Sequence, residues 1–189
     1  YYTAILNLRR GLTENPDFTP AHLLMGDVLV KLGKYPEADS SYAVAEQGDP
    51  QSLEAATRRL KLYALYLKDF QQAEKLLTEA AARFGQSPEI HYYKALVLMG
   101  KRNYLNARSE LQLALALREK YFDARKLQIE IESIIGEPKR ILDAAVQILH
   151  DFPDAVEGYE ISVGHLLKAR TPIEKVLDLF ANAPPTLVL

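Results

Sequence analysis

The chain contains no cysteine and no tryptophan, and only two of its 189 residues are methionine. Without cysteine it can form neither a disulfide nor a thiolate metal site, which leaves its redox compartment open. A net charge of −2 provides no excess of the basic residues that bind nucleic acid. The longest apolar runs, such as residues 95–99, are far too short to span a bilayer. Composition therefore disfavours disulfide-stabilised, nucleic-acid-binding and membrane-spanning proteins.

What the sequence does contain is a regular spacing of alanine. Three alanines are each followed by another seven residues later, and successive pairs are 35 and 34 residues apart. A repeat of this length built from two helices cannot bury its own apolar side and must stack on neighbouring copies. The sequence therefore predicts an all-α chain of stacked helix pairs. The alanines concerned are Ala38 with Ala45, Ala73 with Ala80, and Ala107 with Ala114.

Residues 19–53 carry the remaining positions of this pattern. Small residues stand at Gly26 and Ala38, where two helix backbones approach closely, and the aromatic residues Tyr35 and Tyr42 fill the seams. The pattern closely resembles the tetratricopeptide repeat, with His22 in place of the usual tryptophan. The resemblance implies a right-handed α-solenoid, which is a superhelix of antiparallel helix pairs.

The resemblance also divides the chain into repeats within a single predicted domain, residues 1–189. Lys61 stands where a small residue is expected, so the helix pair of residues 54–87 should be splayed. In the last two repeats Ile141 and Ile148, then Lys175 and Asn182, replace the paired alanines, which makes those repeats degenerate. We expect residues 1–16 to be the second helix of a truncated repeat whose first helix lies upstream, followed by clear repeats at 19–53, 54–87 and 88–121 and degenerate ones at 122–155 and 156–189.

Three helix starts agree with this register. In one of them, Thr171-Pro172-Ile173-Glu174, a capping box predicts an N-cap at Thr171. In Thr19-Pro20 and Ser87-Pro88, a residue whose side chain can cap a helix precedes a proline suited to the first turn. The sequence therefore predicts N-caps at Thr19 and Ser87.

The four histidines give no sign of catalysis. His22 and His91 occupy a packing position of the repeat, His150 ends a predicted helix, and His165 stands alone. None is spaced as a metal-ligand pair, and the chain has neither a phosphate loop nor a nucleophile motif. We therefore expect no enzyme activity, no catalytic residues, no cofactor and no metal.

Certain positions of each first helix line the concave groove in this family, and here they predict a binding site. In the middle repeats they are mostly apolar with one arginine, whereas the far end is acidic. A second interpretation is that some of these leucines only pack one first helix on the next. The lysine and asparagine that bind carboxylates in chaperone-binding members are replaced by Leu23 and Asp27, so that function is not expected. The predicted protein-binding residues are Arg58, Leu62, Tyr66, Tyr92, Leu96 and Met99.

These features predict a non-enzymatic scaffold for protein–protein interaction, which binds a peptide or helix in its concave groove as one part of a larger assembly or secretion protein. One alternative is the regulatory or substrate-recruiting arm of a larger enzyme. Another is an RNA reader similar to the pentatricopeptide repeat, which the acidic charge disfavours. The expected partner is a protein or peptide, with no nucleic acid and no membrane span.

Overall fold

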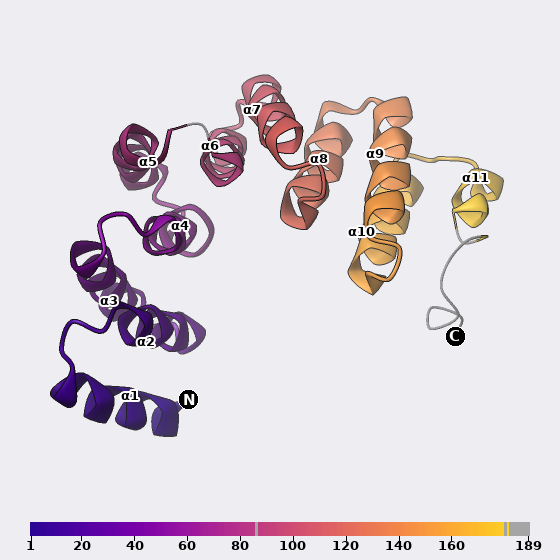
Figure 1. Ribbon diagram of the computed structural model, residues 1–189. Coiled ribbons are helices and arrows are strands. Elements are labelled where there is room, and N and C mark those ends of the chain that lie inside the picture. The colour runs from indigo at the N-terminus through magenta and orange to yellow at the C-terminus, as the bar shows by residue number, and fades with distance from the viewer. Residues whose placement is uncertain (86, 180, 182–189) are drawn as a thin grey trace. The chain divides into compact units, whose positions relative to one another are not determined.

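The computed structural model describes residues 1–85, 87–179 and 181, and these residues form eleven α-helices and one π-helix, without a strand. The chain divides into two compact units, Tyr1–Lys101 and Arg102–Leu189. Short turns join consecutive helices (Figure 1). The predicted all-α class is confirmed.

The first unit consists of helix pairs in which each second helix contacts two first helices. Helix α3 packs on both α2 and α4, and α5 packs on both α4 and α6. In Figure 1, α2, α4 and α6 accordingly lie on one side of this unit and α3 and α5 on the other. The elements are α1 (Tyr2–Glu14), α2 (Thr19–Lys31), α3 (Tyr35–Gly48), α4 (Leu53–Lys61), the π-helix η1 (Leu62–Leu67), α5 (Phe70–Phe84) and α6 (Pro88–Gly100).

The second unit is also built of helices packed side by side. Helix α8 packs on α7, α9 and α10, and α10 also packs on α11. Its elements are α7 (Tyr104–Leu117), α8 (Phe122–Ile135), α9 (Pro138–Asp151), α10 (Val156–Lys168) and α11 (Ile173–Asp178).

The predicted repeat ranges each contain a helix pair, apart from residues 1–16, which contain α1 alone. The pair of residues 88–121, α6 and α7, is divided between the two units. The organisation as a single domain therefore stays a prediction.

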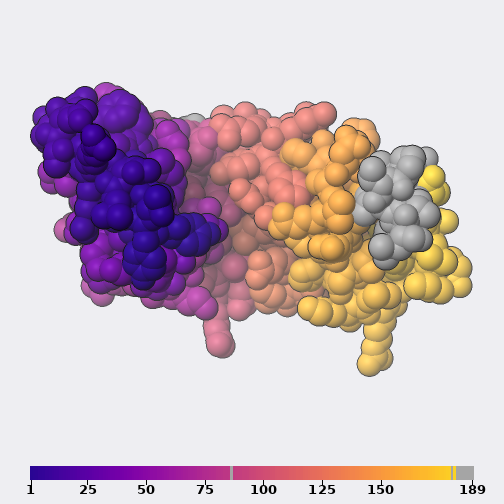
Figure 2. Space-filling view, turned by 90° about the horizontal axis from the view of Figure 1, so that it is seen from below, coloured from indigo at the N-terminus to yellow at the C-terminus, as the bar shows by residue number. Residues whose placement is uncertain are grey.

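The alanine pairs occupy the places that their spacing predicts. All six side chains, Ala38, Ala45, Ala73, Ala80, Ala107 and Ala114, are at most 1% exposed. A methyl group is the largest side chain that allows such close approach of two helix backbones. In the space-filling view, side chains fill the gaps that the ribbon leaves between neighbouring helices of each unit (Figure 2).

Ala73→Leu is expected to lower the free energy of unfolding by about 1–3 kcal/mol, because three extra carbon atoms must enter a filled seam. Ala81→Leu, on the exposed side of the same helix, is the matched control and should change stability by less than about 0.5 kcal/mol. Urea denaturation followed by circular dichroism measures both. Equal midpoints for the two variants would contradict the alanine register.

The degenerate repeats keep the register with larger side chains. Ile141 and Ile148, which stand in place of the paired alanines, are both buried on α9. On α11 the buried residue is Val176, whereas Lys175 beside it is exposed. Asn182 lies outside the described residues. The apolar position of α11 is therefore shifted by one residue from the repeat pattern.

One of the three predicted caps is confirmed. Ser87 precedes α6 and its hydroxyl accepts a hydrogen bond from the backbone N–H of Ile90 at 3.3 Å. Thr19 is already inside the first turn of α2, and the N-cap position is taken by Phe18, whose side chain makes no cap hydrogen bond. The prediction of Thr19 as a cap is wrong by one residue. The prediction of Thr171 is also wrong, because the N-cap of α11 is Pro172, whose side chain makes no cap hydrogen bond.

Candidate functional site

A cleft of about 460 Å³ opens in the first unit between α2 and α4, and we call it the inner cleft. Helices α2 and α4 supply most of its wall, η1 supplies two residues, and α3 and α6 supply one each. The wall therefore combines residues from successive repeats. It is lined by Asp27, Val30, Lys31, Tyr42, Glu54, Thr57, Arg58, Lys61, Leu62, Tyr66 and Tyr93.

One wall of the inner cleft is a fixed network of charges. The guanidinium of Arg58 donates hydrogen bonds to the carboxylate of Asp27 and, at 2.7 Å, to that of Glu54. The second oxygen of Asp27 accepts a hydrogen bond from the Tyr42 hydroxyl at 2.7 Å. Asp27 thus links α2, α3 and α4, while Arg58 is held between two carboxylates.

The protonation of this network is set by burial. Burial, together with the nearby Tyr66, raises the pKa of Tyr42 to about 12, so its hydroxyl remains a donor at neutral pH. Burial also lowers the pKa of Arg58, but an arginine side chain stays charged in proteins. Tyr42 and Arg58 therefore both remain hydrogen-bond donors at neutral pH.

A change of helix type shapes another part of the cleft. Helix α4 ends at Lys61 and continues as the π-helix η1, whose C-cap residue Lys68 is in the left-handed conformation with φ 53°. The hydroxyl of Tyr63 in η1 donates to Asp39 on α3 at 3.0 Å. π-helical turns are rare and occur frequently at functional sites. The π-helix begins directly after Lys61, whereas the splaying of the helix pair that Lys61 suggested stays a prediction.

The π-helix exposes apolar side chains next to the cleft. Leu65, Tyr66 and Leu67 are each about 40% exposed, although they follow one another in sequence. The Tyr66 ring lies 5.9 Å from the ring of Tyr35 on the preceding helix pair, tilted by 38°. Tyr66 is therefore an exposed aromatic residue whose orientation is supported by a neighbour.

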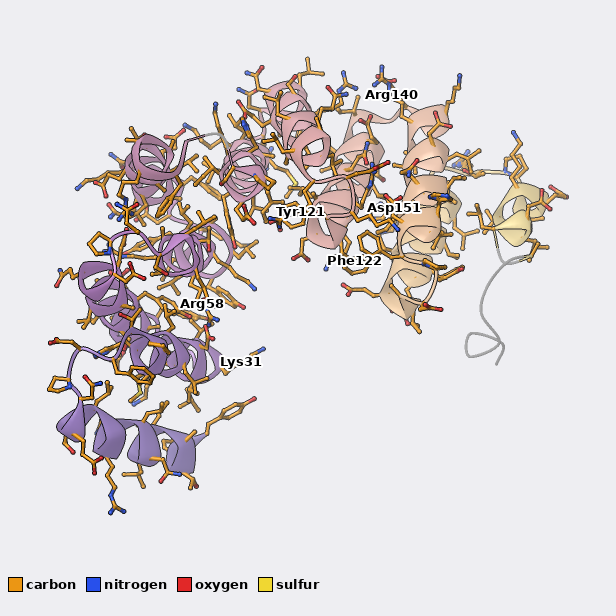
Figure 3. The ribbon with its side chains drawn as sticks, viewed as in Figure 1. Lys31, Arg58, Tyr121, Phe122, Arg140 and Asp151 are labelled. Carbon is orange, nitrogen blue, oxygen red and sulfur yellow. The ribbon has the colours of Figure 1, made fainter. Side chains whose placement is uncertain are left out.

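Two lysines lie at the cleft and differ from Arg58 in their environment. Lys31 is the last residue of α2 and Lys61 the last of α4. Both are exposed, and neither forms an ion pair within residues 1–85, 87–179 and 181. Figure 3 shows Arg58 lying between α2 and α4, while Lys31 extends outward from the end of its helix.

The structure brings three of the six predicted site residues into the inner cleft. Arg58, Leu62 and Tyr66 line it, although Leu62 is only 1% exposed and forms part of its floor. Tyr92, Leu96 and Met99 of α6 are not among its lining residues, and Leu96 is buried.

The residue of α6 that lines the cleft is Tyr93, whose ring meets the edge of the Tyr92 ring at 5.1 Å. Sequence reasoning missed Tyr93, the two lysines and Tyr42, which occupies a packing position of the repeat yet directs its hydroxyl to Asp27.

The second unit uses its charges differently. Lys126 on α8 donates to Glu157 on α10 at 2.9 Å and forms an ion pair with Asp123 at 3.1 Å. Its ammonium also lies 5.0 Å from the centre of the Phe122 ring. Burial would lower the pKa of Lys126, but the hydrogen bonds to the two carboxylates raise it overall. The positive charge of Lys126 is therefore balanced by carboxylates, unlike the charges of Lys31 and Lys61.

No group of three or more histidine, cysteine, aspartate or glutamate residues suited to a metal ion occurs in the described part of the chain. Among the described helices, none combines the length and the apolar character needed to cross a membrane. His22 makes a hydrogen bond to the carbonyl of Pro16 at 2.7 Å, and His91 is buried on α6.

Residues 58–122 match the family model of the tetratricopeptide repeat. These residues belong to the tetratricopeptide repeat family. The match includes Arg58, Leu62, Tyr66 and Tyr93, so part of the inner cleft is built by tetratricopeptide repeats. Proteins of this family are typically scaffolds for protein–protein interaction. No curated protein sequence matches the chain.

Solved structures of tetratricopeptide repeat proteins share the fold at low sequence identity. The thermophilic protein TTC0263 of Thermus thermophilus is 20% identical with a TM-score of 0.77, over 86% of this chain and 89% of its own. PilW, a type IV pilus biogenesis factor, is 15% identical with a TM-score of 0.78, over 96% and 83%. YrrB, described as having an unusual peptide-binding site, is 16% identical with a TM-score of 0.56, over 93% and 89%.

Proposed function

We propose that this chain is a non-enzymatic protein-binding scaffold and that its inner cleft receives a peptide. Stacked repeats provide extended surfaces on which residues outside the repeat pattern can vary. The similarity to YrrB and to PilW supports a peptide-binding role within a larger assembly. We infer that the chain is one part of such an assembly.

The observation that carries this proposal is the exposure of Tyr66 on a π-helix. A helix that served only to pack against its neighbours would bury its large apolar side chains, whereas η1 leaves Tyr66 40% exposed at the cleft. Tyrosine is among the residues that contribute most to binding energy at interfaces. Because Tyr35 supports its ring, Tyr66 loses little conformational freedom when a partner packs on it.

The charge network preorganises part of the cleft wall through hydrogen bonds. Tyr42, Asp27 and Arg58 satisfy one another's hydrogen-bonding groups across three helices. A preorganised wall reduces the entropy that binding must overcome. The volume of about 460 Å³ lies in the range of known ligand sites and accommodates a few side chains, so an extended peptide would place only part of its length inside.

The same network favours binding over catalysis. Asp27 and Glu54 both pair with Arg58, so neither carboxylate is poised as a free general base or acid. Neither a histidine nor a serine lines the cleft. We therefore propose that the chain acts by holding its partner and performs no chemistry on it.

Tyr66→Ala is expected to weaken peptide binding by about 2 kcal/mol, or roughly 30-fold, because truncation removes the aromatic anchor. Panning the full chain against a random peptide display library supplies ligands, whose affinities are measured by fluorescence anisotropy. Tyr2→Ala is the matched control, because Tyr2 is an exposed tyrosine that does not line the inner cleft.

Two results would contradict the proposal. One is a library that yields no ligand, and the other is a set of ligands whose affinity falls no more with Tyr66→Ala than with Tyr2→Ala. Thermal melting of both variants checks that the fold is intact. The exposed position of Tyr66 predicts little change in stability.

A further inference from the structure

The inner cleft holds one more cation than carboxylate. Among its lining residues, Arg58 is bound by the two carboxylates of Asp27 and Glu54. Lys31 and Lys61 are left without an ion pair in the part of the chain that the structure describes. The positive charge available to a ligand therefore resides on these two lysines and not on the arginine.

The two lysines end the helices that form the cleft. Lys31 follows Val30 on α2, Lys61 precedes Leu62, and all four residues line the inner cleft. The positions of these two lysines at the helix ends differ from those of Leu23 and Asp27, where chaperone-binding members of the family carry the lysine and asparagine that bind carboxylates. The lining thus places exposed positive charge beside Val30, Leu62 and the ring of Tyr66.

We propose that the peptide received by the inner cleft is acidic, with carboxylates that pair with Lys31 and Lys61 and a bulky apolar side chain that packs on Tyr66 and Val30. This inference rests on the proposed peptide-binding function. Charge complementarity selects the partner, because a basic segment would meet two unpaired ammonium groups and a neutral one would leave them unpaired.

An anionic membrane surface also attracts lysines beside apolar side chains, but the cleft favours a peptide. Leu62 is 1% exposed and Tyr93 9% exposed, so these residues form a recessed floor. A single side chain of an extended peptide can enter such a recess, whereas the surface of a bilayer cannot follow it. The peptide is therefore the occupant that uses the whole lining.

Three pools of short synthetic peptides test the inference. All pools share the same apolar positions, filled with leucine, phenylalanine or tyrosine, and their other positions carry acidic, amide or basic residues. The acidic pool is expected to bind the full chain about 5- to 20-fold more tightly than the amide pool, since each exposed ion pair contributes a few-fold in affinity. Raising the salt concentration from about 0.1 M to about 1 M, which shortens the Debye length from about 10 Å to about 3 Å, should remove most of this preference.

Substitutions of Lys31 and Lys61 test whether these two lysines cause the preference for the acidic pool. K31Q with K61Q should abolish the preference for the acidic pool, and K31E with K61E should reverse it in favour of the basic pool. K34E with K75E is the matched control, because these exposed lysines lie outside the inner cleft and the change in net charge is the same. The control should retain the preference.

The outcomes separate this inference from the proposed function. Binding that depends on Tyr66 but does not distinguish the acidic from the amide pool overturns the inference and leaves peptide binding intact. Failure of all pools, together with failure of the display library, overturns both. Binding of phosphatidylglycerol vesicles that is lost with K31Q and K61Q, without binding of any peptide pool, overturns the inference in favour of a membrane surface.

Discussion

Asp151→Ala is expected to destabilise the second unit by about 3–5 kcal/mol, because it leaves a buried arginine without its counter-charge. Asp151 ends α9 with its side chain 2% exposed, and it accepts a hydrogen bond from Nε of Arg125 on α8 at 2.8 Å. Gln147 donates to its other oxygen at 2.9 Å. The guanidinium of Arg125 is itself nearly buried, so water cannot replace the lost carboxylate without opening the contact between α8 and α9.

Hydrogen exchange of the backbone amides in α8 and α9 measures this loss of stability in the two helices that the ion pair joins. Asp143→Ala is the matched control, since Asp143 is an exposed residue of the same helix and no ion pair of it is seen among the described residues. Adding Arg125→Leu to Asp151→Ala should restore part of the stability, because the unpaired charge is then removed. Equal exchange for Asp151→Ala and Asp143→Ala would show that the buried pair does not hold the two helices together.

The dependence of stability on pH is a second test of the contribution of Asp151. Burial would raise the pKa of Asp151, but hydrogen bonds from Gln147 and His150 and the charge and hydrogen bond of Arg125 lower it overall. Because the folded-state pKa is below the unfolded one, the carboxylate stabilises the fold fully above its ordinary value of 3.8 and loses this effect as pH falls through the lower, folded-state value. The stability difference between the wild type and Asp151→Ala should therefore shrink only in strong acid.

The helix pairing could be predicted from the alanine spacing because the closest backbone contacts tolerate only the smallest side chains. Where larger residues took over, as at Ile141 and Ile148, the sequence showed that the pattern had changed but not how the helices adjusted. The π-helix is a similar case. Lys61 indicated an irregularity in the repeat, but the sequence did not indicate a π-helix, nor that Tyr63 in it would donate a hydrogen bond to Asp39 of another helix pair.

The candidate site was half predictable for a related reason. A stripe along a helix is defined by the angle at which its residues project from the helix axis. On this basis Arg58, Leu62 and Tyr66 were predicted, and all three line the inner cleft. On α6 the prediction named Tyr92, whereas the residue that lines the cleft is its neighbour Tyr93. Leu96 is buried, in agreement with the second interpretation, in which such leucines serve packing. The lysines at the helix ends lie outside the stripe.

Gly26→Leu is expected to destabilise the first unit by about 3 kcal/mol and to weaken peptide binding at the same time. A Cβ atom on Gly26 would lie 2.3 Å from Cε1 and 2.6 Å from Cδ1 of the Tyr42 ring. Tyr42 is 3% exposed and cannot move aside without breaking its hydrogen bond to Asp27, which also holds Arg58. The overpacking therefore acts on the core and on the wall of the inner cleft together.

Gly11→Leu is the matched control for this prediction, because Gly11 is inside α1 and, apart from its chain neighbours and the nearby backbone of its own helix, no atom lies within 4 Å of the position its Cβ would take. There the same substitution should stabilise the chain by about 0.5–1 kcal/mol through helix propensity alone. Adding Tyr42→Ala to Gly26→Leu should recover part of the stability by making room for the new side chain, but not the binding, since Asp27 and Arg58 lose their support from α3. Urea midpoints that shift in the same direction for both glycines would mean that helix propensity, and not the contact with Tyr42, determines the effect at Gly26.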